Sequence, residues 1–179
     1  INPHFLYNTL ESIKWMAYMN GAREASDMAT ALGKFFKGSI TKGTDWVTFD
    51  EEIEHLKNYI YIQQLRYQDK FIISWEIDEG IKQYRTIKLI LQPIIENAII
   101  HGIEDMKTGG IIIIKGFIDG KSVCFEITDN GRGMSAGKLA ELKSRFLSDS
   151  NGSEHGSIGI SNVFKRLKLY FGENFSFDI

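Results

Sequence analysis

The sequence predicts an α+β fold in which two amphipathic helices precede a domain of mixed strands and helices. Apolar residues recur at helical spacing over the first 40 residues, and strand-like and helical segments alternate from Asp45 onward. The composition is that of a globular protein, with 43% hydrophobic and 25% charged residues in a chain of 179. We therefore expect a helical region over 1–44 and a mixed domain over 45–179.

The first helix is expected over residues 3–20. Asn2 can cap the unpaired amides at its start, and Pro3 suits the first helical position because it has no amide proton to leave unpaired. The helix is expected to stop at Asn20 and Gly21. Its apolar face is formed by Leu6, Leu10, Ile13 and Ala17.

A second helix is expected over 23–40, before Gly43 breaks the pattern. Its apolar side is formed by Met28, Leu32, Phe35 and Phe36. Two helices joined by a short turn form a hairpin, and one hairpin is too small to bury its own apolar stripe. A second copy of the chain would complete a four-helix bundle, so we expect a homodimer.

The mixed domain begins with a short strand over 46–49, and Thr48 with Glu51 resembles a capping box for a helix that runs to Tyr67. The elements expected after it are a strand over 71–77, a helix over 87–102, and strands over 110–118 and 121–128 turned by Asp119-Gly120.

A segment rich in Gly, Ser and Asn spans 130–157, with one helical patch over 139–142. Such a length between regular elements is uncommon in a compact domain unless it is a functional loop or lid. A helix over 158–171 and a strand that begins near Asn174 are expected to close the chain.

The charge pattern excludes some classes of partner. The formal net charge is −2 with positive and negative residues interspersed, so neither nucleic acid nor anionic lipid is expected to bind. No stretch approaches the roughly 18 consecutive apolar residues that span a bilayer, so this piece is expected to be soluble. The single cysteine, Cys124, cannot form an internal disulfide and is expected in the core. Because the chain starts at Ile1, we expect it to be part of something longer.

The helix expected over 87–102 has one polar edge. Asn97 and His101 are four residues apart and share a helix face, next to Glu96. An Asn amide oxygen is a hard neutral ligand suited to Mg²⁺, which takes its remaining oxygens from water and nucleotide phosphates. A helix end with incidental polar residues is the alternative interpretation.

Two glycine-containing turns accompany this helix. Asp129 ends a strand and could accept a hydrogen bond from an exocyclic amine such as that of adenine, while Gly131 and Gly133 let backbone and base approach closely. A plain Asn-Gly turn is the alternative. The turn Gly156-Ser157-Ile158-Gly159 opens a helix, whose amides can receive phosphate.

The order of these motifs resembles a known family. Asn-Pro-His-Phe-Leu-Tyr-Asn at 2–8, Glu-Asn-Ala-Ile-Ile-His-Gly at 96–102, Asp-Asn-Gly-Arg-Gly-Met at 129–134 and Ile-Gly-Ile-Ser-Asn-Val-Phe-Lys-Arg-Leu at 158–167 are similar to sensor histidine kinases of the LytS/YesM type. The resemblance implies a helical dimerisation and phosphoacceptor region, followed by an ATP-binding domain of the gyrase, Hsp90, histidine kinase and MutL superfamily. That domain is an α/β sandwich (Bergerat-type) in which a mixed sheet faces three helices and ATP lies under a lid.

The resemblance also implies an activity. Such a kinase takes a phosphoryl group from ATP with Mg²⁺ onto its own histidine and passes it to an aspartate of a response regulator. The chain would then be the cytoplasmic portion of a bacterial membrane-anchored sensor that works as a homodimer.

By position, the resemblance makes His4 the phosphoacceptor, Asn97 the Mg²⁺ ligand, Asp129 the adenine reader and 131–157 the lid. The other nucleotide-binding residues that it implies are His101, Gly131, Gly133, Gly156, Ser157, Ile158, Gly159 and Ile160.

Two catalytic roles and one departure concern the chemistry. Larger kinase families place an acid directly after the histidine, whereas Phe5 stands here, so Glu96 is our candidate base. Asn8, one helical turn after the histidine, is a candidate for orienting water in dephosphorylation of the regulator. Pro93 stands where gyrase-like ATPases carry the carboxylate that activates water, which disfavours rapid ATP hydrolysis.

Two other functions stay open: an ATPase of the gyrase or Hsp90 type, and a pseudokinase that binds nucleotide or dimerises as a scaffold. Of the other histidines, His55 is expected to be solvated on a charged helix face, and His155 to be a surface residue of the lid. Aromatic and methionine residues near the first turn are expected to pack between helices rather than to hold a ligand: Trp15, Met16, Tyr18 and Met19.

Overall fold

The computed structural model describes residues 3–40, 45–68, 70–147 and 158–179. Helices α1 (Pro3–Met19) and α2 (Arg23–Ile40) form the expected hairpin, with Gly21 at a positive φ of 75° between them. The elements of the mixed domain are β1 (Trp46–Thr48), α3 (Phe49–Arg66), β2 (Phe71–Ile77), the 3₁₀ turn η1 (Glu79–Ile81), β3 (Arg85–Ile87), α4 (Gln92–Asn97), the π-helical η2 (Ala98–Ile103), β4 (Gly110–Asp119), β5 (Ser122–Asp129), α5 (Ala136–Leu147) and α6 (Ile158–Phe171).

Two small sheets form. Strand β4 lies between β2, with which it is parallel, and β5, with which it is antiparallel, so this three-stranded sheet is mixed. Strands β1 and β3 pair separately as an antiparallel ribbon. Alternate residues of β4 point to opposite faces, and its buried face carries Ile112 and Ile114. Helices cover that face, and the core between the two layers includes Ile53, Leu56, Ile95, Ile99 and Val163.

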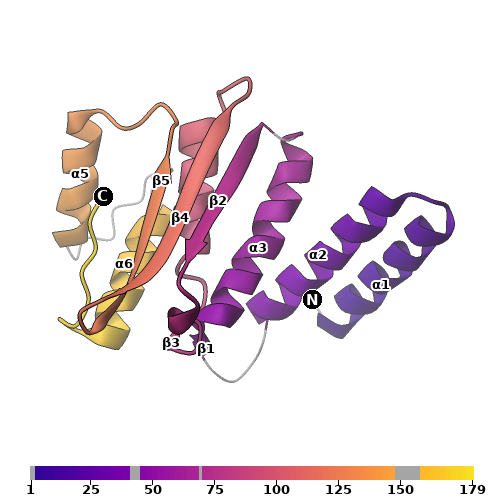
Figure 1. The fold of residues 1–179 in the computed structure, drawn as a ribbon, viewed down its shortest axis with the longest axis horizontal. Coiled ribbons are helices and arrows are strands. Elements are labelled where there is room, and N and C mark those ends of the chain that lie inside the picture. Colours follow the sequence, from indigo (N-terminus) through magenta and orange to yellow (C-terminus); the bar gives the residue numbers. More distant parts are fainter. Residues whose placement is uncertain (1–2, 41–44, 69, 148–157) are drawn as a thin grey trace.

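The arrangement of the layers is visible in Figure 1. The α1–α2 hairpin lies at one end of the molecule and α5 at the opposite end, with α3 and the sheet between them. Helix α2 packs against α3, where Phe35 lies close to the rings of His55 and Tyr59. The hairpin is therefore attached to the mixed domain through α3.

Local signals explain most boundaries. The capping box is confirmed: Glu51 N–H donates to Thr48 Oγ1 at 3.2 Å, and Thr48 N–H donates to Glu51 Oε2 at 2.8 Å. Gly120 takes a φ of 59° in the turn that joins β4 to β5. None of the helices within the described ranges is long and apolar enough to cross a membrane.

Two expectations about elements were wrong, and a third was too short. The helix predicted from residue 87 begins at Gln92, because 85–87 pairs with β1. Residues 174–179 form no strand; Phe175 and Phe177 pack on Phe164 instead. The helical patch predicted over 139–142 belongs to a longer helix, α5. The rest of the predicted lid, 148–157 with His155, lies outside the described residues, as does Gly43.

Side-chain burial brings two further corrections. His55, expected in solvent, is 7% exposed, because the side of α3 that it occupies is covered by α2 and by the start of α4. Cys124, expected in the core, is partly exposed opposite Phe117, since even-numbered residues of β5 point away from the helices.

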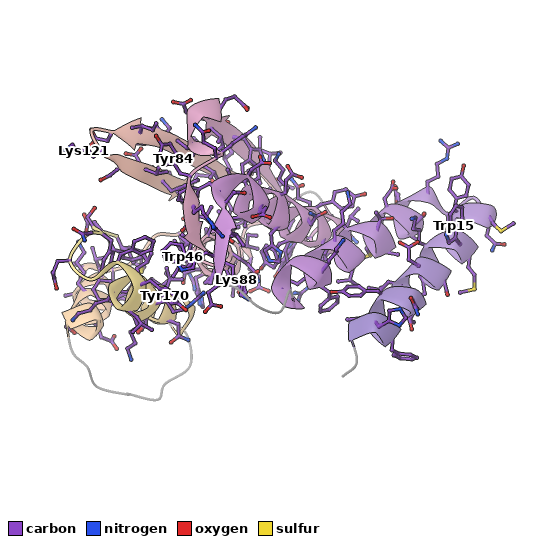
Figure 2. The ribbon with its side chains drawn as sticks, turned by 90° about the horizontal axis from the view of Figure 1, so that it is seen from below. Trp15, Trp46, Tyr84, Lys88, Lys121 and Tyr170 are labelled. Atoms are coloured by element: carbon purple, nitrogen blue, oxygen red, sulfur yellow. The ribbon has the colours of Figure 1, made fainter. Side chains whose placement is uncertain are left out.

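A cluster at the start of the mixed domain ties it to the last helix. Figure 2 shows Trp46, Lys88 and Tyr170 gathered together, with Trp15 at the far end of the hairpin. The rings of Trp46 and Tyr170 meet edge-on at 5.8 Å, Tyr170 donates a hydrogen bond to Asp45, and Lys88 Nζ lies 3.6 Å from Asp45 Oδ1. The hydrogen bond from Tyr170 lowers the pKa of the Asp45 carboxyl.

Candidate active site

The predicted nucleotide helix is split into two kinds of turn. It is α-helical up to Asn97, which is half-buried, and π-helical from Ala98 to Ile103. His101 lies in the π segment and is exposed. Single π turns within helices occur often at functional sites. Asn97 and His101 were predicted to share one face because residues four apart do so in an α-helix. The wider π turn between them changes the relative orientation of the two side chains.

The loop that leads into this helix is held by a carboxylate that sequence reasoning missed. Glu52 is 2% exposed and accepts three backbone hydrogen bonds, from Leu89 N–H at 2.8 Å, Ile90 N–H at 2.7 Å and Leu91 N–H at 3.0 Å. From the other side, the Arg166 guanidinium donates to the carbonyl oxygens of residues 88 and 89. Buried charges require such partners, so the start of α4 is fixed by both α3 and α6.

The turn after β5 packs directly on the end of η2. Asp129 Oδ1 accepts from Gly131 N–H at 2.9 Å, and Arg132 N–H donates to Gly102 O at 3.3 Å. A Cβ on Gly131 would lie 2.4 Å from Gly102 O, and a Cβ on Gly102 would lie 2.7 Å from Asp129 Oδ1. Only glycine fits at either position without displacement of backbone or carboxylate.

Asn130 fixes this turn to the sheet. Its Oδ1 accepts from Ile111 N–H at 2.7 Å, and its Nδ2 donates to Gly109 O at 3.0 Å. Asp129 itself is exposed, and its Oδ2 accepts no hydrogen bond from the described residues. The turn thus joins β4, β5 and the end of η2. Gly133 follows at a φ of 65°.

The start of α6 lies against α4. A Cβ on Gly159 would lie 3.3 Å from Pro93 Cβ, and Ile160 is buried in the core. Ile158 is the first residue of α6, whereas Gly156 and Ser157 lie outside the described residues. The structure thus brings Asn97, Asp129, Gly131 and Gly159 to elements that contact one another: α4, η2, β5 and α6.

Glu96, the candidate base, belongs to the same helix and is half-buried. Burial of the Tyr59 hydroxyl, and secondarily the nearby negative charge of Glu96, raise the Tyr59 pKa above its ordinary value of 10.0.

His4 is not brought to this site. It is exposed in the first turn of α1, where the side-chain amide nitrogen of Asn8 lies 3.3 Å from His4 Nδ1. The hairpin that carries it lies at the opposite end of the molecule from α5 (Figure 1).

The hairpin also exposes large apolar side chains. The predicted inner face is only partly confirmed, since Leu10 is buried while Ile13 is exposed. The four residues expected to pack between helices are exposed in the single chain, Met19 by 83%. The other large apolar residues exposed on α1 and α2 are Phe5 and Met28.

Comparison with known families agrees with this arrangement. Residues 82–177 match the family described as histidine kinase-, DNA gyrase B-, and HSP90-like ATPase, and residues 1–71 match the histidine kinase family. The chain belongs to this ATPase family, and its first 71 residues match the histidine kinase family. The resemblance inferred from the four motifs is confirmed.

Particular relatives support the same assignment. The chain is 36% identical to the sensor histidine kinase YesM of Bacillus subtilis and 30% identical to the sensor histidine kinase BtsS of Escherichia coli, over all 179 residues in both cases. It is 30% identical to the sensor protein LytS of Streptococcus agalactiae over 96% of its length. It spans 29% of the length of each of these relatives. A solved structure of a bacterial phosphotransferase aligns over 94% of this chain and 79% of its own, at 13% identity and with a TM-score of 0.43.

Proposed function

We propose that this chain is the kinase portion of a two-component sensor, which transfers a phosphoryl group from ATP to His4 and then to an aspartate of a response regulator. The observation that carries the proposal is the glycine-lined junction of η2 with the Asp129 turn, next to the start of α6. A histidine on an exposed helix of the same chain supplies the acceptor.

The residues present fit ATP. Asp129 Oδ2 is an exposed acceptor for the exocyclic amine of adenine, and the absence of side chains at Gly102 and Gly131 lets the Asp129 turn pack directly on the end of η2. Gly159 and the first amides of α6 stand where phosphates would meet a helix N-terminus. We assign Gly133, His101, the backbone of Ile160 and the turn 156–158 to the same nucleotide-binding surface, because the Ile160 side chain is buried. We take the domain to be an α/β sandwich of the Bergerat type.

The Asn97 side chain would hold Mg²⁺ through its amide oxygen, with the remaining ligands from water and phosphate. The metal would neutralise charge that develops on the transferred group. Glu96 is our candidate to take the proton from the histidine that enters the site. Pro93 occupies the first turn of α4 and offers no base for water, which favours transfer to histidine over hydrolysis.

Radioactive labelling tests the proposal. The chain is incubated with γ-labelled ATP and Mg²⁺, and we expect acid-labile, alkali-stable label on the protein that is lost in His4→Gln. Release of free phosphate without protein label would instead indicate a gyrase-like or Hsp90-like ATPase. Neither product, together with no ATP affinity by calorimetry, would indicate a scaffold and would reject the proposal.

We further propose that the chain acts as a homodimer in which one copy phosphorylates the other. The exposed apolar residues of α1 fit a second hairpin, which would complete a four-helix bundle. In addition, α1 packs on α2, and α2 on α3, so a neighbouring copy could present His4 while this docking of the hairpin is kept.

A mixture of two inactive variants tests transfer between copies. His4→Gln keeps the nucleotide site, and Asn97→Ala keeps the acceptor. If transfer is between copies, the mixture labels the Asn97→Ala chain, and labelling increases with protein concentration. Label that forms only when both residues are in one chain contradicts transfer between copies.

For Asn8 we propose a role in removing phosphate from the regulator, because its amide already lies beside the His4 ring. Asn8→Ala is expected to keep autophosphorylation and to slow loss of phosphate from the regulator. Equal loss of both activities rejects this role. The chain spans 29% of the length of its relative YesM. We propose that the sensing and membrane-spanning parts lie in the remaining length, and that the 179 residues of this chain lie in the cytoplasm.

A further inference from the structure

One face of α3 lies against the loop before α4 and against the first residue of α4. Glu52, His55 and Tyr59 are spaced so that they share this face. Glu52 holds the loop before α4, and His55 contacts the first residue of α4. Helix α3 therefore positions the start of α4 through two successive contacts, of which the first is described above.

The middle contact is a buried histidine. His55 Nε2 lies 3.0 Å from Gln92 Oε1, and Gln92 is the first residue of α4. A carbonyl oxygen only accepts, so with the Gln92 amide assigned in this orientation, His55 Nε2 is the donor. His55 Nδ1 is buried and has no hydrogen-bond partner among the described residues. Such an unpaired polar atom is uncommon in a protein interior.

The other side of the ring faces the hairpin. Phe35 of α2 stacks on His55 with centroids 4.7 Å apart and planes inclined by 20°. One turn further along α2, Gly38 lies so close that a Cβ there would stand 2.5 Å from His55 Nδ1. The ring of His55 thus packs between α2 on one side and Gln92 of α4 on the other.

We propose that His55 is a positioning residue through which the docking of the hairpin on α3 sets the position of α4, and with it Asn97. The inference rests on the proposed function in one respect, namely that α4 belongs to the nucleotide site. A movement of α2 displaces the buried ring of His55. The ring in turn displaces Gln92 through their hydrogen bond, because packed interiors move in discrete steps. The hairpin's position would in this way alter ATP binding.

Two glycines of α2 provide a matched test. Gly38→Ala places a methyl group against His55, whereas a Cβ on Gly33 meets nothing within 4 Å. Both substitutions favour the helix equally. Forcing the ring off its rotamer is expected to weaken Mg-ATP binding about two- to tenfold in Gly38→Ala, with no change in Gly33→Ala. Hydrogen exchange of the amides of 92–97 in the 179-residue chain, without nucleotide, is expected to quicken only in Gly38→Ala.

A second pair of variants separates the hydrogen bond from the packing. His55→Gln places an amide nitrogen where Nε2 stood and keeps a donor for Gln92, whereas His55→Phe keeps the stack on Phe35 and loses the donor. We expect His55→Phe to quicken exchange in α4 and to weaken Mg-ATP binding, and His55→Gln to do neither. In the His55→Gln background, Gly38→Ala should have no effect, because the crowded ring is gone.

Several results would overturn the inference. They are equal behaviour of the two glycine variants, an effect of Gly38→Ala that persists unchanged without the ring, and equal behaviour of His55→Phe and His55→Gln. If Gly38→Ala does not fold, the two His55 variants decide the matter. If the wild type binds no Mg-ATP, the proposed function fails, while hydrogen exchange still decides whether His55 couples α2 to α4.

Discussion

The buried carboxylate of Glu52 offers the sharpest test of how the nucleotide helix is held. Its three hydrogen bonds, of 2.7, 2.8 and 3.0 Å, all go to backbone amides of the loop before α4. In Glu52→Gln, one oxygen can still accept, but the new NH₂ group faces an amide that is also a donor. Hydrogen bonds to a charged group each contribute about 1.5–3 kcal/mol, and those left are weaker without the charge.

We therefore expect Glu52→Gln to lower the free energy of unfolding by about 3 kcal/mol, since loss of the buried charge offsets part of the missing bonds. In a domain of this size, that corresponds to a fall in Tm of about 6–12 °C. The control is Glu54→Gln on the same helix, an exposed carboxylate paired with Lys57 at 2.6 Å. An exposed ion pair contributes about 0–1 kcal/mol.

The assay is urea unfolding of both variants, followed by far-UV circular dichroism. Glu52→Gln should move the midpoint to lower urea with an unchanged slope, because the surface exposed on unfolding stays the same. Equal midpoints for the Glu52 and Glu54 variants would refute the argument that the loop is held by this carboxylate.

Three further predictions follow from local geometry. Gln68→Gly should stabilise the chain by about 1 kcal/mol in urea unfolding, because Gln68 has a φ of 50° just after α3, where glycine carries no steric penalty; a loss of stability would contradict this. Gly131→Ala should abolish adenylate binding in calorimetry, since its Cβ would lie 2.4 Å from a backbone oxygen of η2, whereas Gly137→Ala meets open space and should bind normally. Burial raises the Tyr59 pKa in the folded chain, so its neutral hydroxyl stabilises the fold fully below about pH 10, and this stability is lost as the pH rises further. Tyr59→Phe should therefore flatten the alkaline fall in stability, and a slope equal to that of the wild type would count against the assignment.

Elements with strong local signals could be predicted from the sequence. The capping box at Thr48 and Glu51, the glycine at residue 21 and the Asp119-Gly120 turn each act within a few residues, so the adjoining helices and strands begin and end close to where expected. Residues 174–179 have the composition of a strand but pair with no neighbour, and composition alone does not reveal a missing partner.

The nucleotide-binding roles of the candidate site residues stay predictions. Gly131 was expected to allow a close approach of backbone and base, and the structure shows its close approach to the backbone of Gly102. The burial of Glu52 and His55 could not be predicted, because their partners are 37–39 residues further along the chain. Glu52 and His55 have Glu and Lys neighbours on the same helix, so the sequence pattern predicted a solvated face there.

The two proposals about the hairpin constrain each other. Phosphoryl transfer needs the acceptor within about 3–3.5 Å of the reacting atom. Within one copy, any movement of the hairpin toward the nucleotide site that carries α2 off α3 would break the stack of Phe35 on His55. Between copies, the same contact can persist through the reaction. If the mixed His4→Gln and Asn97→Ala chains label each other, a disturbed His55 contact should lower ATP affinity without changing which copy is labelled. If label forms only within one chain, the contact must open in each cycle, and Gly38→Ala should speed transfer while it weakens ATP binding.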